Sequence, residues 1–301
     1  MNKSTSDKNL KALHGPIAAL ITPIDKNGDF DSAGMRRLVR HVIKNRIKGI
    51  FILGSAGEAP CFSIEEKEKI IKTVVGEVNK KVPVLVGAGQ NTTKGTVDFI
   101  KQTGKLGADY AVVVLPLWRP NWVSDNDIIR HYNEIAKKSN IPVLAYNLPS
   151  EAAPISLKAA KGLGKTRHIA GIKDSSCDMK NIRQFSRIMP VFQGNDAEIY
   201  PALKEGAAGI VSGLANIIPK KISDIYRNYE IGDFEEAGRI QEEIRKVSDL
   251  MMTICKKNPL AGIKFCLYKK GICGQYVNKP YAELTNAEKG RIMKKIMPYI
   301  D

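Results

Sequence analysis

Residues 109–115 read DYAVVVL, an apolar run in which polar and apolar side chains do not alternate. Such a run is typical of a strand that is buried on both faces, as strands are in a parallel sheet. Seven further segments share this pattern: PIAALIT (16–22), GIFILG (49–54), VPVLVGA (82–88), IPVLAYN (141–147), HIAGIK (168–173), PVFQG (190–194) and AGIVS (208–212). The sequence therefore predicts a sheet of eight parallel strands.

Amphipathic segments with helix-start signals lie between these strands. Ser63 precedes the segment IEEKEKIIKTVVGEV, and Glu66 follows three residues later, which is the pattern of a capping box. Strands that alternate with helices in this way predict an α/β fold, a TIM (β/α)8 barrel over residues 1–218. Residues 219–301 are predicted to form a C-terminal helical extension that includes the last barrel helix. A doubly wound sheet is the weaker alternative, because it leaves several strands without a place.

The composition is that of a soluble globular protein, with 43% apolar and 26% charged residues in a chain of 301. The net charge of +16 does not indicate nucleic-acid binding, because basic residues are spread along the chain and often stand beside acids. The first ten residues, MNKSTSDKNL, lack the apolar core of a signal peptide, and no apolar run reaches the ~20 residues that span a bilayer. Five cysteines without a C-x-x-C pair and four scattered histidines predict neither disulfides nor a metal site. We expect a cytoplasmic protein that binds no membrane.

Candidate catalytic residues stand where predicted strands end, because the active site of a TIM barrel lies at the carboxyl ends of its strands. Lys173 ends HIAGIK, where partial desolvation would leave a neutral amine free to attack a carbonyl group. Tyr146 ends the preceding strand, where its hydroxyl can carry protons. The small residues of GSAG (54–57) let backbone N–H groups approach a carboxylate. Each feature alone is more often structural, but all three fall on one face of the same barrel.

Four motifs follow predicted strands in order: GSAGE (54–58), YNLPS (146–150), GIKDSS (171–176) and GND (194–196). Together they resemble the dihydrodipicolinate synthase/N-acetylneuraminate lyase family. The resemblance begins at Thr22 and Pro23 and extends through NPLAGIK (258–264), so it covers nearly the whole chain. It implies a class I aldolase or lyase that joins or cleaves a 2-oxo acid, such as pyruvate, and an aldehyde.

The resemblance also implies a role for individual residues. Lys173 is expected to form the Schiff base, Tyr146 to donate and accept protons, and the Ser55 hydroxyl to bond to that tyrosine. The backbone N–H groups of Ser55 and Ala56 are expected to hold the carboxylate of the 2-oxo acid, with Val211 beside the bound pyruvate. No metal or cofactor is implied, because the protonated imine is itself the electron sink. The full set of expected substrate-binding residues is Ser55, Ala56, Val211, Gly194, Glu151 and Trp118.

Three positions depart from the pattern of the dihydrodipicolinate synthases. Glu151 stands where those enzymes carry an arginine that anchors the carboxylate of the aldehyde, and an anion there should repel it. Trp118 stands where they carry a tyrosine of a proton relay, and an indole is only an N–H donor. Ala56 replaces a threonine that many members have. The N-acetylneuraminate lyase pattern is not reproduced either, although Arg119 and Trp122 offer groups for an anionic or polyhydroxylated acceptor.

These departures favour a lyase that acts on a 2-keto-3-deoxy sugar acid. Three alternatives remain open: a dehydratase with the same Schiff-base chemistry, a 4-hydroxy-tetrahydrodipicolinate (dihydrodipicolinate) synthase despite Glu151, and a catalytically silent binding barrel. Members of the family are commonly homotetramers, so the resemblance also implies a homo-oligomer.

Overall fold

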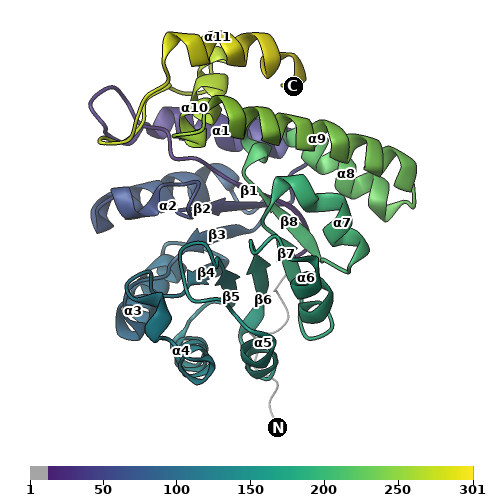
Figure 1. Ribbon diagram of the computed structural model, residues 1–301. Helices are drawn as coiled ribbons and strands as arrows, with labels where there is room; N and C mark the ends of the chain where they lie inside the picture. The colour runs from purple at the N-terminus through teal and green to yellow at the C-terminus, as the bar shows by residue number, and fades with distance from the viewer. Residues whose placement is uncertain (1–12, 301) are drawn as a thin grey trace.

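The computed structural model describes residues 13–300, and its centre is a closed barrel of eight parallel strands in sequential order (Figure 1). Their bounds are β1 Gly15–Ala19, β2 Gly49–Ile52, β3 Val84–Gly87, β4 Tyr110–Val114, β5 Val143–Asn147, β6 Ile169–Asp174, β7 Val191–Gln193 and β8 Gly209–Ser212. The first strand pairs with both β2 and β8, which closes the barrel. The predicted TIM barrel is therefore confirmed, with each strand inside the apolar run that predicted it or displaced from it by one residue.

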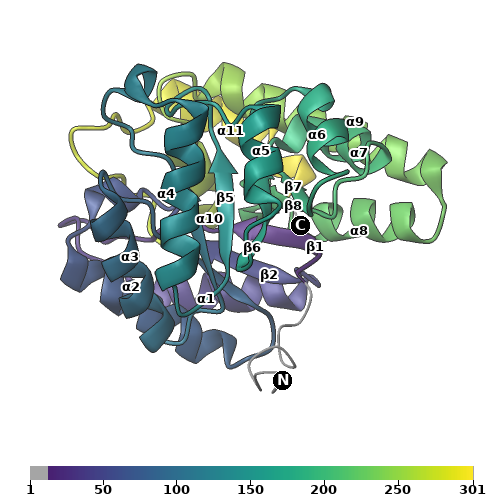
Figure 2. The ribbon, with the colours of Figure 1, turned by 90° about the horizontal axis from the view of Figure 1, so that it is seen from below.

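Eight helices alternate with the strands and surround the barrel, as Figure 2 shows from a second direction. Their bounds are α1 Ser32–Lys44, α2 Ile64–Val78, α3 Thr93–Lys105, α4 Asp125–Lys138, α5 Leu157–Leu163, α6 Met179–Phe185, α7 Ile199–Lys204 and α8 Pro219–Glu230. The capping box at the start of α2 is present, since the Ser63 hydroxyl accepts from the Glu66 N–H and the Glu66 carboxylate accepts from the Ser63 N–H. It satisfies two of the backbone donors that a helix start leaves free.

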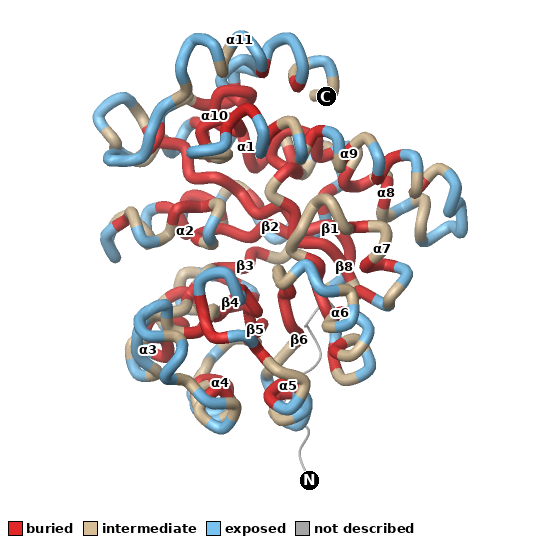
Figure 3. The backbone as a smooth tube through the Cα atoms, in the orientation of Figure 1, coloured by how far each residue is buried: buried red, intermediate tan, exposed pale blue. Residues whose placement is uncertain are grey.

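Two separate apolar cores explain why the strands are apolar on both faces. The inner core fills the barrel and includes Ile17, Phe51, Leu85, Leu144 and Phe192. The outer core lies between the strands and the surrounding helices, and it holds most of the other buried apolar side chains. Figure 3 shows the barrel strands as a nearly continuous buried region with exposed segments at the periphery. Side chains on both faces of each strand are therefore buried. For this reason the strand sequences lack the alternation of polar and apolar residues that is seen when one face of a sheet is exposed.

The C-terminal part of the chain adds three helices beyond the barrel: α9 Phe234–Ile254, α10 Pro259–Lys269 and α11 Asn286–Lys295. The long α9 packs along α8 and reaches α7, while α11 lies over α9 and α10 (Figure 1). The boundary predicted after residue 218 falls just before α8, and the division into two domains stays a prediction. None of the helices within residues 13–300 is both long enough and apolar enough to cross a bilayer. The polar segment MNKSTSDKNL lies outside the described residues.

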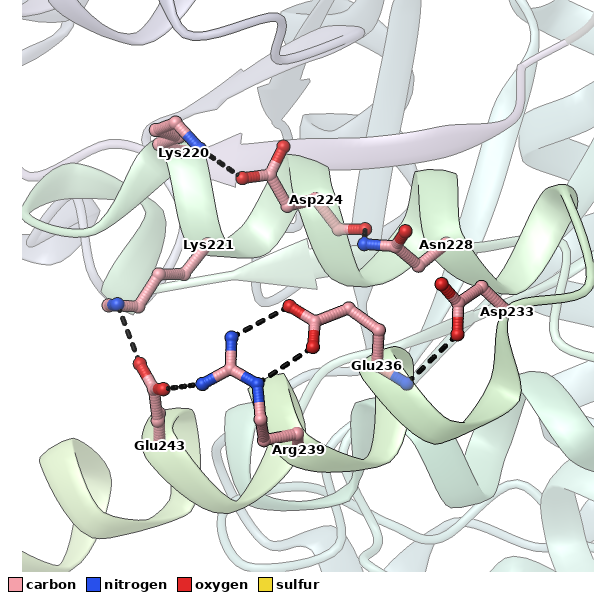
Figure 4. A network of polar contacts seen from close by, with 8 residues as sticks. All are labelled: Lys220, Lys221, Asp224, Asn228, Asp233, Glu236, Arg239 and Glu243. Carbon is pink, nitrogen blue, oxygen red and sulfur yellow. Dashed lines mark hydrogen bonds and ion pairs between the residues drawn. The ribbon is translucent and has the colours of Figure 1, made fainter.

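The hairpin of α8 and α9 combines a buried apolar seam with a polar network on its surface. Ile222 and Ile225 of α8 and Ile244 of α9 are fully buried. Figure 4 shows that Glu243 accepts from both Lys221 and Arg239, and that Arg239 also forms a paired contact with Glu236. Ion pairs as exposed as that of Arg239 typically contribute about 1 kcal/mol or less. The apolar seam therefore dominates the stability of the hairpin.

Candidate active site

Lys173 and Tyr146 lie side by side inside the barrel. Their Cα atoms are partners in the register of β5 and β6, so both side chains point to the same face of the sheet. The ammonium nitrogen of Lys173 is 3.8 Å from the centroid of the Tyr146 ring and 5.1 Å from that of Phe51. Only 5% of Lys173 and 6% of Tyr146 is exposed. A primary amine is thus held in a largely dry, aromatic environment at the end of the strand.

The phenol of Tyr146 is surrounded by polar groups that favour its ionised form. Burial alone would raise the pKa of Tyr146, but the Lys173 charge and hydrogen bonds with Lys173, Ser175 and Ser55 lower the pKa below its ordinary value. The predicted contact with Ser55 is therefore present. Ser175 was not predicted from the sequence, although it is the second residue after the predicted strand in GIKDSS, where the strand-end rule would have found it. A phenol in these surroundings can release and recover a proton more readily than one in water.

The turn after β2, here called the cradle, contains Ser55 and Ala56, whose backbone N–H groups are expected to hold a carboxylate. Ser55 is exposed, and Ala56 is partly buried beside the inner core. Among the described residues, none accepts a hydrogen bond from the backbone N–H of Ser55 or Ala56. The turn is held by the Thr22 hydroxyl, which donates to the carbonyl of Gly57 at 2.7 Å, and a Cβ at Gly57 would lie 2.8 Å from a backbone nitrogen. Free amide donors on a fixed turn are typical of anion-binding sites, and the role of this turn in binding a carboxylate stays a prediction.

Gly194 lies beside the Lys173 side chain. Gly194 follows β7, and a Cβ built on it would lie 2.1 Å from the Ser175 hydroxyl oxygen and 3.2 Å from Cε of Lys173. Any larger residue there would displace one of these side chains. Val211 of β8 is 3% exposed and belongs to the inner core. Gly194 thus limits the space around the Lys173 side chain, and a role of Gly194 and Val211 in substrate binding stays a prediction.

Two carboxylates, the buried Asp174 and the partly buried Asp196, connect strand ends near the site. Asp174 accepts from Asn147 at 2.5 Å and from the Ser176 hydroxyl at 2.7 Å, which joins the ends of β5 and β6. Asp196 accepts from the Leu214 N–H at 3.0 Å and from the Ser212 hydroxyl, which joins the loop after β7 to β8. Burial raises the pKa of both carboxyl groups, although their hydrogen bonds act in the opposite direction. Sequence reasoning assigned neither a function.

A cavity of about 860 Å³ opens beside these residues. The residues that line it include Phe51, Ser55, Tyr146, Lys67, Glu151, Trp118, Lys257 and Tyr281. Lys67 is half-buried, and this burial lowers the pKa of its amine. Neither Lys67 nor Glu151 forms an ion pair with another residue in the range 13–300. The cavity is far larger than a three-carbon acid, and charges of both signs line its outer part.

The rim of the cavity contains an exposed aromatic cluster. Trp118 and Trp122 are 66% and 69% exposed, and their rings meet edge to face with centroids 5.4 Å apart. The guanidinium of Arg119 lies 5.9 Å from the Trp118 ring and 5.2 Å from the Trp122 ring. Trp118 lines the cavity, whereas Arg119 and Trp122 do not. Of the candidates for acceptor recognition in this segment, only Trp118 therefore reaches the cavity.

The chain is similar in sequence and in structure to known proteins. Residues 12–298 match the model of the dihydrodipicolinate synthetase family. The 4-hydroxy-tetrahydrodipicolinate synthase of Coxiella burnetii is 28% identical over 285 residues, which cover 94% of this chain and 97% of that protein. The enzyme of the same name from Thermodesulfovibrio yellowstonii is 31% identical over 283 residues, covering 92% and 95%. The solved dihydrodipicolinate synthase of Acinetobacter baumannii, in complex with pyruvate, is 27% identical with a TM-score of 0.88, covering 94% and 97%.

Proposed function

Because the chain belongs to the dihydrodipicolinate synthetase family, whose members are Schiff-base-forming lyases, we propose that Lys173 captures pyruvate and joins it to an aldehyde. The observation that carries this proposal is the position of the Lys173 amine, which is 3.8 Å from the Tyr146 ring centroid and 5% exposed as a residue. Pyruvate is bound in the related solved enzyme of A. baumannii. The predicted family is confirmed by the family match, and the predicted fold by the closed barrel. The roles of the individual residues are part of the proposal.

The reaction begins when the neutral amine of Lys173 attacks the carbonyl carbon of pyruvate. Tyr146 delivers a proton to the oxygen of the carbinolamine, water leaves, and a protonated imine forms. The ionised Tyr146 then takes a proton from the methyl carbon to give an enamine, which attacks the aldehyde carbon, forms the new C–C bond and leaves an alkoxide that takes the proton back from Tyr146. Addition of water to the imine then releases Lys173. The same steps run in reverse for cleavage. The water and the protons that are released in one step are taken up in another, so the reaction requires no oxidant.

The surrounding residues prepare these steps. The free N–H groups of Ser55 and Ala56 hold the pyruvate carboxylate, while the hydroxyls of Ser55 and Ser175 share protons with Tyr146. Val211 provides an apolar contact beside the bound acid. Gly194 leaves the space that the Lys173 side chain and Ser175 require.

Reductive trapping tests the covalent step. The chain is incubated with pyruvate, reduced with borohydride, and digested for peptide mass measurement. We expect a reduced pyruvyl adduct on the peptide that contains Lys173, and none in Lys173→Ala. A folded wild-type chain that forms no adduct with pyruvate or a panel of 2-oxo acids would leave the silent binding barrel as the better hypothesis.

We propose that the aldehyde is a carboxylate-bearing semialdehyde, as in 4-hydroxy-tetrahydrodipicolinate synthase. The names of the curated relatives support this acceptor more than the sugar acid that the sequence favoured. The cations of Lys67 and Lys257 on the cavity wall support it as well, because they offset the unfavourable charge of Glu151. Condensation of pyruvate with aspartate semialdehyde, followed by product mass, tests the proposal directly.

A 2-keto-3-deoxy sugar acid remains the second candidate. It is favoured by Glu151, which lines the cavity as an exposed carboxylate and suits a hydroxyl-bearing partner better than an anionic one. Release of pyruvate from such an acid would support a lyase, whereas loss of water without pyruvate would support a dehydratase. We also propose a homo-oligomer, most simply a tetramer, because Leu117, Trp118 and Trp122 leave apolar surface exposed at the rim. Light scattering of the purified chain measures its mass.

A further inference from the structure

A lysine with no exposed surface forms an ion pair with Glu58, which lines the cavity of the candidate active site. Lys264, on α10, is 0% exposed, and its ammonium nitrogen is 2.5 Å from Oε2 of Glu58, which is 8% exposed. Lysine is almost never fully buried unless it is paired. The other carboxylate oxygen, Oε1, accepts from the side-chain amide of Asn278 at 3.0 Å. The C-terminal part of the chain thus supplies two groups to one carboxylate of the barrel.

Glu58 ends the turn that carries Ser55 and Ala56. Its backbone has a φ of 54°, a left-handed conformation that is unusual for a residue with a side chain. Its N–H donates to the carbonyl of Ser55 at 3.1 Å, and the next residue, Ala59, donates to the carbonyl of Gly54 at 3.4 Å. A displacement of Glu58 is therefore transmitted through the backbone to the two free amide groups of the cradle.

A buried ion pair is a poor source of stability, because the loss of hydration offsets much of the attraction between the charges. What the pair supplies is a fixed separation and direction, since any movement of the turn away from α10 would leave an uncompensated charge in the interior. The two oxygens of the Glu58 carboxylate have different partners. Oε2 pairs with Lys264, and Oε1 accepts a hydrogen bond from Asn278, so the orientation of the carboxylate is fixed.

We propose that Lys264 and Glu58 are positioning residues, which hold the N–H groups of Ser55 and Ala56 where the carboxylate of the 2-oxo acid binds. This inference rests on the proposed function of the site and assigns a role to the C-terminal part of the chain, which contacts the substrate-binding turn through Glu58. Lys173 and Tyr146 stand on β6 and β5 and make none of these contacts. Loss of the pair should therefore weaken recognition of the carboxylate and leave the reactivity of the amine intact.

A comparison of pyruvate with acetone separates these two effects. Acetone has the same carbonyl group, with a methyl group in place of the carboxylate. Occupancy of Lys173 after borohydride reduction is measured by peptide mass as a function of the concentration of each compound. In Lys264→Met we expect the half-saturating concentration of pyruvate to rise at least about tenfold, as when a charge-assisted hydrogen bond is lost. Labelling by acetone should change less than about twofold.

Two further variants protect the test against simple misfolding. Lys264→Met/Glu58→Gln leaves no unpaired charge in the interior, and Asn278→Ala removes only the second contact of the carboxylate. Both variants should weaken labelling by pyruvate more than labelling by acetone, and the effect should be smaller for Asn278→Ala. Lys269→Met is the control, because it removes an exposed lysine from the same helix as Lys264. It should change neither the labelling by pyruvate nor the labelling by acetone.

The outcomes are distinct. An adduct in the wild type, with pyruvate half-saturation unchanged in all three folded variants, would overturn the inference alone. A parallel loss of pyruvate and acetone labelling would also overturn it, because a general loss of structure would then suffice. A wild-type chain that forms no pyruvate adduct would overturn the proposed function, and the inference with it.

Discussion

The ammonium nitrogen of Lys173 lies 3.8 Å from the centroid of the Tyr146 ring, and the Cα atoms of the two residues are partners in the register of neighbouring strands. The relationship is therefore set by the sheet and not by mobile loops. A positioned amine beside a positioned phenol is the arrangement that imine formation requires, because nucleophile and proton carrier must meet at one carbonyl group.

Removal of the phenol oxygen should slow proton transfer while leaving the aromatic surroundings of Lys173 in place. We expect Tyr146→Phe to lower kcat about 10²- to 10³-fold, the usual contribution of a positioned acid or base. Single-turnover formation of the pyruvate adduct measures the effect. Tyr229→Phe is the matched control, because its hydroxyl donates to the Leu203 carbonyl outside the site at 2.8 Å. Equal rates for Tyr146→Phe and the wild type would show that another group carries the proton.

A side chain at position 194 should disturb the lysine directly. A Cβ there would lie 2.1 Å from the Ser175 hydroxyl oxygen, so Gly194→Ala must move Ser175 or the strand end. We expect adduct formation to slow by about tenfold or more, since small misplacements of reacting groups are costly. Gly76→Ala in α2 meets no atom within 4 Å and should keep full activity, with a gain in stability of about 1 kcal/mol. Normal kinetics of Gly194→Ala would mean that the site tolerates the shift.

The charge at position 151 should determine how an anionic acceptor binds. We expect Glu151→Arg to lower KM for aspartate semialdehyde about tenfold, because a repulsive group is replaced by a charge-assisted donor. Glu151→Gln only removes the repulsion and should give a smaller gain. Steady-state kinetics at saturating pyruvate measure both variants. If neither variant changes KM, the carboxylate of the acceptor binds away from Glu151.

Stability should fall with acid because of a buried histidine. Burial lowers the pKa of His131 to about 4, and its Nδ1 is 2.9 Å from the Thr93 hydroxyl oxygen. Between the unfolded value of 6.5 and about 4, the unfolded chain binds a proton that the folded chain does not, so the free energy of unfolding falls as the pH falls. The loss attributable to this residue is at most about 3 kcal/mol.

Denaturant unfolding of the wild type and His131→Gln at several pH values isolates this contribution. The two free energies of unfolding should converge or cross toward pH 4, because glutamine cannot take up the proton. Parallel curves across the window would show that His131 is as accessible to protons in the folded chain as in the unfolded one.

Much of the architecture follows from local patterns in the chain. Eight apolar runs such as DYAVVVL specify strands buried on both faces, and the intervening amphipathic segments specify the helices that cover them. Because the barrel brings all strand ends to one face, Lys173 and Tyr146 were recognisable as neighbours from their places in the runs. The motifs around them also identified the family that the comparison confirmed.

Other features of the site were decided only by the tertiary structure. Lys264 stands inside a helix that is mostly buried, and Glu58 stands in a turn far away in the chain, so neither segment alone indicates that the two charges meet. Local sequence likewise does not indicate that Gly194 lies close to Ser175 or that Trp118 lines the cavity. Local sequence determines which faces must be buried, because burial of apolar surface depends on the periodicity of each segment. Which polar groups meet in that interior depends on the packing of segments far apart in the chain, and no periodicity within one segment encodes it.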